Sequence, residues 1–348
     1  MKNCLYILYI GLMSVLIASC QQSLDEVQTL PVLSKAQITF TVALDNQNSL
    51  SRATWKENDS IAGSEVGVVK DNQIDLSSED GMQVFLYDLN GNLLGEVTNK
   101  EIFKLSENTY KFHGEMVIEN LSSETLECCL MVYANCTYAA DTFQYNVQYM
   151  PMWGVRKTTL NLVKGELTNI AESICLLRSM AKVEVKLHTD IAADFELDSV
   201  IVDKYNATGN ILPAYGKLDD TESLDLEQVF NPVNASYATN LAFNKINEDE
   251  FYVYLPEYRN VGNQASPAKI SIYIGDKTYF IEFKNYVDGK PEDNAYNIVR
   301  NHSYQYTITS VATNIDVSLE ELTYQSMPWQ DVDNGNLDFG KEDGDVIN

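Results

Sequence analysis

Basic residues and histidine are scarce in this sequence of 348 residues. Lys and Arg number 24 against 50 Asp and Glu, which gives a formal net charge of −26. Because phosphates and anionic lipid surfaces attract clusters of Lys and Arg, this deficit argues against nucleic acid as a partner and against adsorption to an anionic membrane face. The chain has 21 Tyr but only 3 His and 3 Trp, a balance that favours strands over a histidine-based centre. The hydrophobic content of 45% indicates a folded protein.

Motifs of known enzyme and metal sites are also missing. His113, His188 and His302 lie far apart and form no HExxH pattern, and there is no G-x-S-x-G, P-loop or G-x-G-x-x-G segment. The segment most similar to a calcium loop starts at Asp331, but its glycine comes one position too early. Residues 331–348 are therefore interpreted as a solvated acidic tail. The sequence predicts no enzyme, no metal and no cofactor.

The N-terminus carries the longest apolar run. Residues 5–17 are almost entirely apolar but too few to cross a bilayer, which takes about 20 residues in a helix. The run ends in Ile17-Ala18-Ser19-Cys20, which looks like a bacterial lipobox, so residues 1–20 are predicted to be a lipoprotein signal peptide and residues 21–36 a polar tether. Lipid on Cys20 would hold the protein at the outer membrane or cell surface. The alternative is an ordinary signal peptide with an accidental cysteine.

Beyond Cys20 the remaining cysteines are Cys128, Cys129, Cys136 and Cys175. An exported protein can form disulfides, and four cysteines allow three complete pairings that the sequence does not rank. Cys128 and Cys129 are adjacent in a predicted strand, where neighbouring side chains point to opposite faces, so they are poor partners for each other. The spacing fits no zinc pattern. Buried free thiols are the favoured interpretation, and the disulfide state is left open.

Apolar residues alternate with period two along most of the chain, and long helical patterns are missing. In residues 37–44, for example, Ile38, Phe40, Val42 and Leu44 are predicted to point inward. The other predicted strands are 82–88, 93–97, 128–133, 159–163, 173–177, 181–187, 195–202, 251–255, 269–274, 278–283, 303–311 and 315–319.

Turn signals and domain size complete the prediction of the fold. Asn90-Gly91 and Gly275-Asp276-Lys277 predict hairpin turns, and short helices are expected only near residues 221–230. The chain therefore reads as all-β, with two antiparallel sandwiches in tandem. The boundary is placed near Arg178, which gives an N-terminal sandwich over residues 37–177 and a C-terminal one over residues 178–330.

Several short strings together resemble one protein family. They are Gln83–Gly95, Tyr149–Gly154, Leu176–Val185, Tyr254–Tyr258 and Asn297–Tyr304. In this order and spacing, and with the lipobox in front, they resemble the fimbrillin-type lipoproteins of gut and oral Bacteroidales. The resemblance covers nearly the whole chain.

The resemblance implies a subunit of a cell-surface type V pilus, as stalk, tip or anchor. Its fold would be two transthyretin-like β-sandwiches. Its partners would be other fimbrial subunits, joined by strand exchange. In that family a lipoprotein precursor is cut after an arginine by an Arg-specific protease, its first strand leaves, and the terminal segment of a neighbour fills the groove.

Arg52 is the residue that fits this processing step. The chain has five arginines, and Arg52 is the one between Cys20 and the predicted body of the protein. Cleavage between Arg52 and Ala53 would release the product from its lipid and remove the strand at 37–44. The alternative is that Arg52 is an ordinary arginine in a surface linker.

The donor strand and the wider role stay open. Residues 315–319 and 324–329 would be either a donor strand or edge strands of the second sandwich, and Pro328 suits an edge position. The alternative function is an outer-membrane surface lipoprotein that does not polymerise and binds a glycan or host ligand.

Overall fold

The structure is a computed structural model. It describes residues 34–44, 73–78, 81–106, 109–118, 125–138, 140–161, 167–171, 173–213, 219–232, 237–263, 266–287, 290–311 and 322–328. Within these ranges the regular structure is strands plus one short 3₁₀ helix, η1 (Thr221–Ser223), so the prediction of an all-β chain is confirmed. None of the described residues forms a helix with the length and apolarity needed to cross a membrane. The signal peptide, Cys20, the tether, Arg52 and the tail at 331–348 lie outside the described residues.

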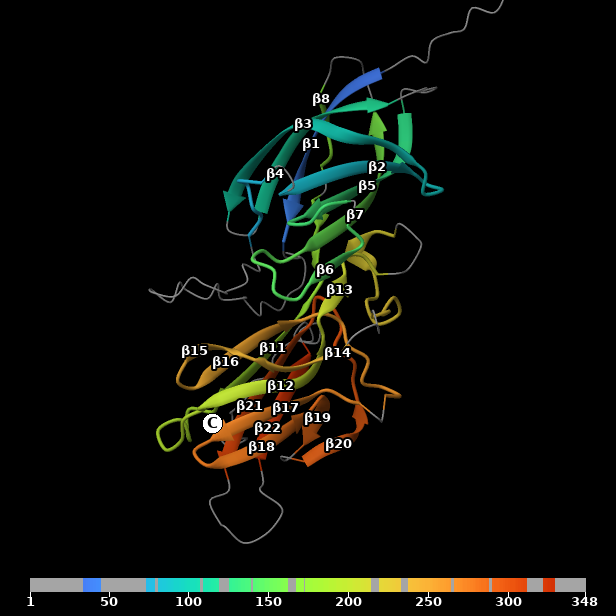
Figure 1. Cartoon of the computed structure of the whole chain (residues 1–348). Helices are drawn as coiled ribbons and strands as arrows, with labels where there is room; N and C mark the ends of the chain where they lie inside the picture. The colour runs from blue at the N-terminus through green and yellow to red at the C-terminus, as the bar shows by residue number, and fades with distance from the viewer. Residues whose placement is uncertain are drawn as a thin grey trace, which may run out of the picture.

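The first body is one curled sheet around a hydrophobic core (Figure 1). Its strands run in the order β10-β7-β5-β2-β3-β4-β1-β8, and β9 also pairs with β1. Inward side chains of β1 and β4 share the core with those of β2, β5 and β7. The strands of this part of the chain are β1 (Ser34–Ala43), β2 (Met82–Asp88), β3 (Leu93–Ser106), β4 (Thr109–Ile118), β5 (Thr125–Ala134), β6 (Thr142–Gln144), β7 (Met152–Asn161), β8 (Leu167–Asn169), β9 (Ile174–Cys175) and β10 (Leu177–Arg178).

The second body consists of two facing sheets. One has the order β15-β16-β11-β21-β22 and the other β14-β12-β17-β18, and a second core, including Val183 and Ile272, fills the space between them. A separate hairpin is formed by β19 and β20. The strands are β11 (Ala181–Leu187), β12 (Ser199–Asn206), β13 (Thr208–Asn210), β14 (Tyr237–Ala242), β15 (Asn244–Asn247), β16 (Glu250–Leu255), β17 (Lys269–Ile274), β18 (Lys277–Glu282), β19 (Lys284–Val287), β20 (Lys290–Ala295), β21 (Ser303–Val311) and β22 (Leu322–Pro328).

The chain beyond residue 210 returns to the first body. The small sheet of β6 and β13 lies between the two bodies in Figure 1. The Thr221 hydroxyl accepts a hydrogen bond from the Val155 N–H at 3.2 Å and donates to the Cys175 carbonyl at 2.7 Å. Leu226 and Val229 are buried in the first core. A segment that follows the predicted boundary near residue 178 therefore packs on the N-terminal sheet.

A buried ion pair of the second body lies at its junction with the first. Arg300 is fully buried, and its Nη2 lies 2.8 Å from Glu257 Oε2. The other guanidinium nitrogen, Nη1, donates to the Ile211 carbonyl at 2.9 Å. Ser179 Oγ, at the start of the second body, donates to the same carbonyl at 2.8 Å. The junction is thus held by charge-assisted hydrogen bonds shielded from solvent.

Turn chemistry explains both predicted hairpins. Gly91 and Gly275 have φ angles of 84° and 60°, values that glycine adopts at little cost. In the first turn, the Asp88 carboxylate accepts hydrogen bonds from the backbone N–H groups of Asn90 and Asn92 at 2.9 and 2.8 Å. These bonds, with those from the Asn92 side chain first, lower the pKa of Asp88.

Several details differ from the sequence-based expectation. The strand predicted at 195–202 begins only at Ser199, because the His188 carbonyl accepts from the N–H groups of Ile191 and Ala192 and turns the chain there. The strand β4 was not predicted. Antiparallel pairs predominate, but β11 pairs with β21 in parallel, and β1 pairs with β8 and β9 in parallel. The predicted strand at 315–319 lies outside the described residues.

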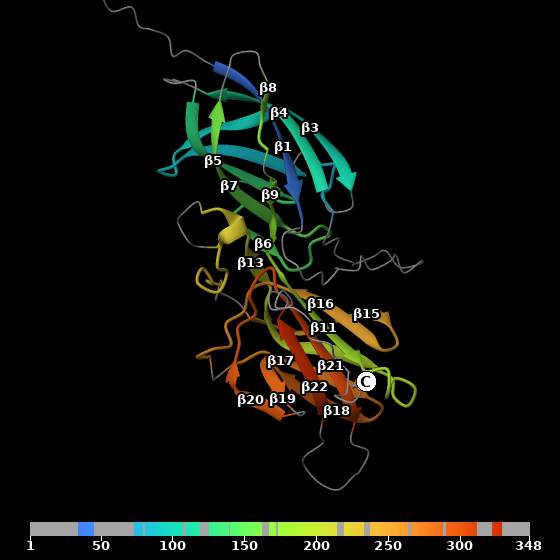
Figure 2. The same ribbon diagram turned by 180° about the vertical axis from the view of Figure 1, so that it is seen from behind.

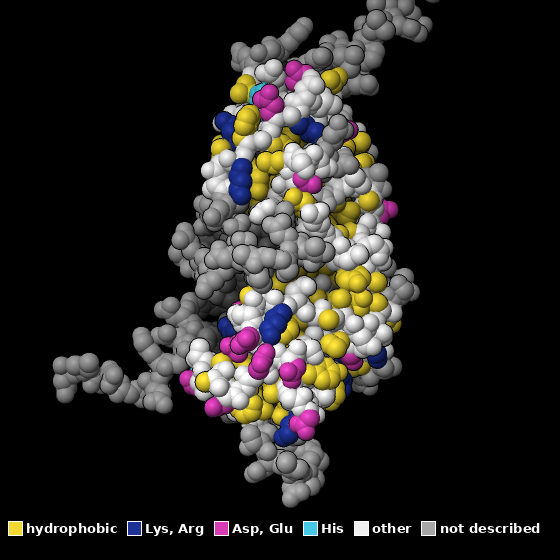
Figure 3. Space-filling model, turned by 60° about the vertical axis from the view of Figure 1, so that its left-hand side comes forward, with side chains coloured by type: hydrophobic (Ala, Val, Ile, Leu, Met, Phe, Trp, Pro, Cys, Tyr) yellow, Lys and Arg dark blue, Asp and Glu magenta, His cyan; other side chains and the backbone are white. Residues whose placement is uncertain are grey.

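Surface charge is mixed on the face that Figure 3 presents, where acidic side chains lie beside Lys and Arg on the lower body. Ion pairs of this kind include those of the Glu282 carboxylate, which has Lys284 Nζ at 2.8 Å and Lys269 Nζ at 3.3 Å. The hydrogen bond from Lys284, together with that from Lys269, lowers the pKa of Glu282. Exposed pairs of this kind add little stability.

Candidate functional site

The first strand, β1, has partners on both sides within the first body. It pairs with β4 in antiparallel register from Ser34↔Ile118 to Ala43↔Thr109. On its other side are the short parallel strands β8 and β9 (Figure 2). Beyond the strand ladders, the Thr39 carbonyl accepts from the Ile170 N–H, and the Ala43 carbonyl from the Leu176 N–H, each at 2.9 Å. The backbone of β1 is therefore bonded on both edges.

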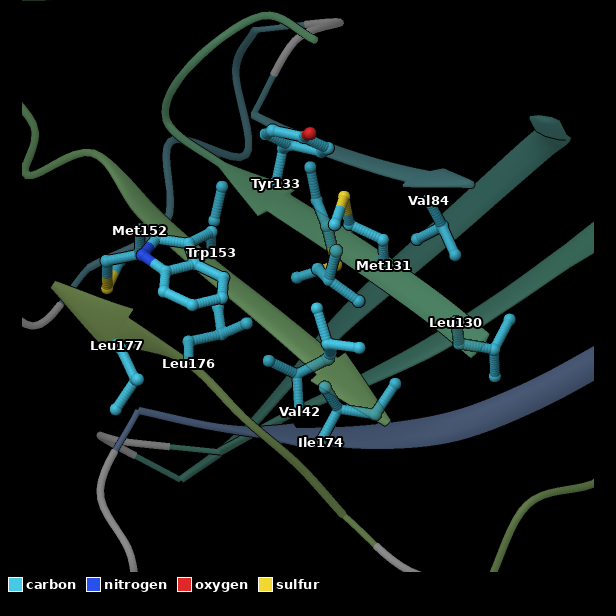
Figure 4. Close-up of a cluster of buried hydrophobic side chains, with 14 of the residues drawn as sticks. Val42, Val84, Leu130, Met131, Tyr133, Met152, Trp153, Ile174, Leu176 and Leu177 are labelled. Carbon is cyan, nitrogen blue, oxygen red and sulfur yellow. The ribbon is translucent and has the colours of Figure 1, made fainter. Parts of the chain in front are cut away.

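The alternate side chains of β1 point into the core. Ile38, Phe40, Val42 and Leu44 are each exposed by 1% or less. The ring of Phe40 stacks on that of Phe112 in β4, with centroids 4.8 Å apart. Figure 4 shows Val42 of β1 beside Ile174 of β9, in the same cluster as Leu130 of β5. These contacts make β1 a central part of the first core.

A glycine on β4 allows close packing in the part of the sheet that pairs with β1. Gly114 pairs with Ile38, and a Cβ added to Gly114 would lie 2.5 Å from Val97 Cγ1 and 3.1 Å from the Phe112 ring. Distances this short require the neighbours to move. A side chain larger than hydrogen at residue 114 would therefore disturb the wall against which β1 packs.

The chain connection makes β1 separable from the rest of its sheet. After Leu44, the next described segment is residues 73–78, and the next strand, β2, starts at Met82. Arg52 and Ala53 lie in this interval, outside the described residues. A cut between Arg52 and Ala53 would leave β1 held in the body only by the non-covalent contacts described above.

The other arginines have differing access to solvent. Arg178 and Arg300 are buried, at 3% and 0% exposure. Arg156 is half-buried within β7, where its Nη1 lies 2.7 Å from Glu222 Oε2. Arg259 is exposed, with its guanidinium carbon 5.3 Å from the centre of the Phe230 ring. Of the four arginines in the described part of the chain, Arg259 alone is exposed.

The four cysteines of the body are free thiols. Burial raises the pKa of the Cys128 and Cys136 thiols to about 12 each. Burial, as the largest effect, also raises the pKa of Cys129. Thiols in this state are poor nucleophiles and poor metal ligands near neutral pH.

A pocket of about 450 Å³ opens beside the β17–β18 turn and the segment before β12. Its walls combine carboxylates with apolar side chains, and they are formed by Asp194, Phe195, Glu196, Asp198, Ile274, Gly275, Asp276, Lys277, Tyr279 and Val311. No set of three or more His, Cys, Asp or Glu among the described residues is arranged to hold a metal ion. The pocket is a second candidate site, for a small ligand instead of a strand.

Sequence reasoning identified the inward residues of β1 and, in the strand predicted at 173–177, the segment that contains β9, but it did not show that β9 lies beside β1. The strand β8 was missed, because its three residues are too few for any periodicity to be visible. In β4, by contrast, the buried residues Tyr110, Phe112, Met116 and Ile118 alternate with less buried ones, so a signal was present. Only the pairing of β4 with β1 required the structure.

Comparisons with known proteins give structural neighbours only. No family model and no curated protein matches the chain. The structure is similar to a fimbrial assembly protein from Parabacteroides distasonis, with 13% identity, a TM-score of 0.46, and coverage of 86% of this chain and 97% of the other. It is also similar to the fimbrial anchor protein Mfa2 from Porphyromonas gingivalis, with 10% identity, a TM-score of 0.30, and coverage of 75% and 95% respectively. Both neighbours carry the description of fimbrial proteins, one of assembly and one of anchoring.

Proposed function

We propose that this chain is a structural subunit of a cell-surface fimbria that assembles by β-strand exchange. Export as a lipoprotein through Cys20, cleavage between Arg52 and Ala53, and replacement of β1 by a strand of another subunit are the steps of the proposal. The observation that carries it is β1 itself, a buried strand bonded on both edges and followed by an interval that contains an arginine. No enzymatic activity is part of this proposal.

The energetics favour replacement of β1 over a permanently open groove. Removal of Ile38, Phe40, Val42 and Leu44 from the core would cost about 1.5–3 kcal/mol per side chain, or about 6–12 kcal/mol in total. A whole domain is stable by only about 5–15 kcal/mol. Loss of β1 would therefore leave the first body marginal, and an incoming strand that fills the same positions would be bound tightly through main-chain hydrogen bonds and side-chain pockets.

The position of the arginines also supports cleavage at Arg52. The buried Arg178 and Arg300 and the strand residue Arg156 are withheld from a protease by the fold. Cleavage at any of these would break a core that the product needs. Of the strands that the structure describes, only β1 comes before Arg52, so a cut there leaves the rest of both bodies covalently whole.

The donor segment is proposed to come from another subunit and is not assigned to a particular strand. Among the described strands, β22 lies at the edge of its sheet and pairs with β21, and Pro328 is its last residue. An edge strand on one side of a sheet is the kind of segment that can be exchanged between subunits. Whether the chain acts as stalk, tip or anchor is left open, and lipid on Cys20 would place the precursor at the outer membrane.

The test is an Arg52→Ala variant expressed in a cell that assembles the fimbria. We expect the wild-type surface protein to begin at Ala53 and to form heat-stable oligomers. The Arg52→Ala protein should begin at Cys20, carry lipid and remain monomeric. A matched Arg259→Ala variant should be processed and assembled as the wild type is. Normal assembly of Arg52→Ala would refute the proposal. A wild-type protein that stays monomeric and begins at Cys20 would favour the alternative, a surface lipoprotein that binds a glycan or host ligand.

A further inference from the structure

Arg259 presents a problem for any maturation by an Arg-specific protease. It lies in an exposed turn after β16, with its guanidinium over the Phe230 ring. The sequence offers a protease the same residue type here as at Arg52. A cut at Arg259 would separate β11 to β16 from β17 to β22 and divide the second core.

The backbone on both sides of the Arg259–Asn260 peptide bond is hydrogen-bonded. Tyr258, just before it, is fully buried and exchanges two backbone hydrogen bonds with Ile298, at 3.0 and 2.9 Å. Asn297 Oδ1 accepts from the backbone N–H groups of both Asn260 and Val261, each at 3.0 Å. One asparagine side chain therefore holds the N–H of the scissile peptide bond and the next N–H along the chain.

The scissile carbonyl and the residue after it are held as well. The Arg259 carbonyl accepts from Asn263 Nδ2 at 3.2 Å. The side chain of Asn260 is 5% exposed, and its Nδ2 donates to the Tyr296 carbonyl at 3.1 Å. Its Oδ1 accepts from the Ala268 N–H at 2.9 Å. Asn260 thereby fastens the turn to both neighbouring segments.

Peptide segments that dock by main-chain pairing do so in extended form, through the same N–H and C=O groups. A protease that binds its substrate in this way needs those groups released, and for a folded protein it must wait for local opening. Exposure of the arginine side chain alone is therefore not enough for cleavage. The number of bonds that must break at once determines how often this turn opens.

We propose that Asn260 and Asn297 form a latch that withholds the exposed Arg259 from Arg-specific proteolysis. The latch itself follows from the hydrogen bonds above. Its biological role, which is to confine maturation to Arg52, rests on the proposed function. Arg178 and Arg300 need no such device, because they are buried. The two asparagines thus act as specificity-determining residues for the proposed cleavage.

The test is digestion of the purified full chain with an Arg-specific endopeptidase, followed over time by mass spectrometry. In the wild type we expect cleavage after Arg52 and none after Arg259 in the same period. Asn297→Ala should be cut after Arg259 at least tenfold faster than the wild type. Asn210→Ala is the matched control, since the bond of the Asn210 side chain to the described residues is a surface hydrogen bond to the Asn231 carbonyl at 3.3 Å. It should be digested as the wild type is.

A second variant checks that the cut falls after residue 259, and the pattern of cuts at the buried arginines distinguishes local opening from global unfolding. Asn297→Ala combined with Arg259→Lys should resist the Arg-specific enzyme at this bond but be cut there by a lysine-specific endopeptidase. Cleavage of Asn297→Ala after Arg259 without cleavage at the buried Arg178 and Arg300 supports the latch. Simultaneous cutting at all three would indicate global unfolding and overturn it, as would an Asn297→Ala protein that stays intact at Arg259. An intact Arg52 bond combined with a labile Arg259 in Asn297→Ala would retain the latch and refute the proposed maturation.

Discussion

The contribution of β1 to the first body can be measured with one substitution. Phe40 is 1% exposed and stacks on Phe112 at 4.8 Å. Replacement of a buried Phe by Ala costs about 3–5 kcal/mol, because the transfer free energy is lost and a cavity remains. We expect Phe40→Ala to lower the free energy of unfolding of the uncleaved protein by this amount. Gln37→Ala is the control on the same strand, since Gln37 is exposed and its loss should change stability by about 0.5 kcal/mol or less.

Urea denaturation followed by tyrosine and tryptophan fluorescence is the assay, and it also tests replacement. After cleavage at Arg52, the protein should unfold at lower urea, and the midpoint should recover on addition of a peptide of residues 34–44. At the same concentration, a peptide carrying Phe40→Ala should raise the midpoint less, because it binds with lower affinity. The stabilisation by a bound peptide follows its concentration relative to Kd, so a titration gives the affinity directly.

Two results would refute this reasoning. If Phe40→Ala were no more destabilising than Gln37→Ala, the contact with Phe112 would not contribute as the structure implies. If the cleaved protein kept the urea midpoint of the intact one after β1 had been removed by gel filtration under mild denaturant, the first body would not need its strand. Strand exchange would then lack a driving force, because binding a replacement strand would not stabilise the first body.

Two further predictions concern the junction and the thiols. Arg300→Met should lower the free energy of unfolding by about 3–5 kcal/mol in urea denaturation, because it leaves the Glu257 carboxylate buried without its partner. Arg300→Met combined with Glu257→Gln should recover much of this loss. Equal stability of the single and double variants would contradict the prediction. Burial raises the thiol pKa values of Cys128 and Cys136 to about 12. Both should therefore react with iodoacetamide at pH 8 only after unfolding in urea, with the number of labels counted by mass spectrometry. Rapid labelling of the native protein would contradict this prediction, because it would show that these thiols are accessible.

Local patterns in the sequence were enough to predict many of the strands, because apolar and polar side chains alternate between the two faces of a half-buried strand. The alternation of Ile38, Phe40 and Val42 correctly predicted that these side chains are buried, although Thr39 and Ala43 on the other face are buried as well. Asn90-Gly91 predicted the first hairpin. Each of these features depends on residues that are close together in the chain.

Long-range pairing was not predictable in the same way. Nothing in residues 167–169 indicates that they lie beside β1, because a three-residue strand has no period. The latch at Asn260 depends on Asn297, a partner 37 residues away in the sequence. An asparagine in a turn is common for local reasons, so neither residue stands out without the fold.

The unequal partners of β1 suggest how exchange could proceed. On one side, all ten residues of β1 pair with β4. On the other side, within the described residues, β8 pairs with Gln37–Thr39 and β9 with Val42 and Ala43. The short flank has fewer hydrogen bonds to break, so it should open first and leave β4 as the template. A replacement strand would then pair antiparallel to β4 and would need apolar side chains at alternate positions, to occupy the places of Ile38, Phe40 and Val42. A strand with the opposite alternation would place polar side chains in the core, and the groove should reject it.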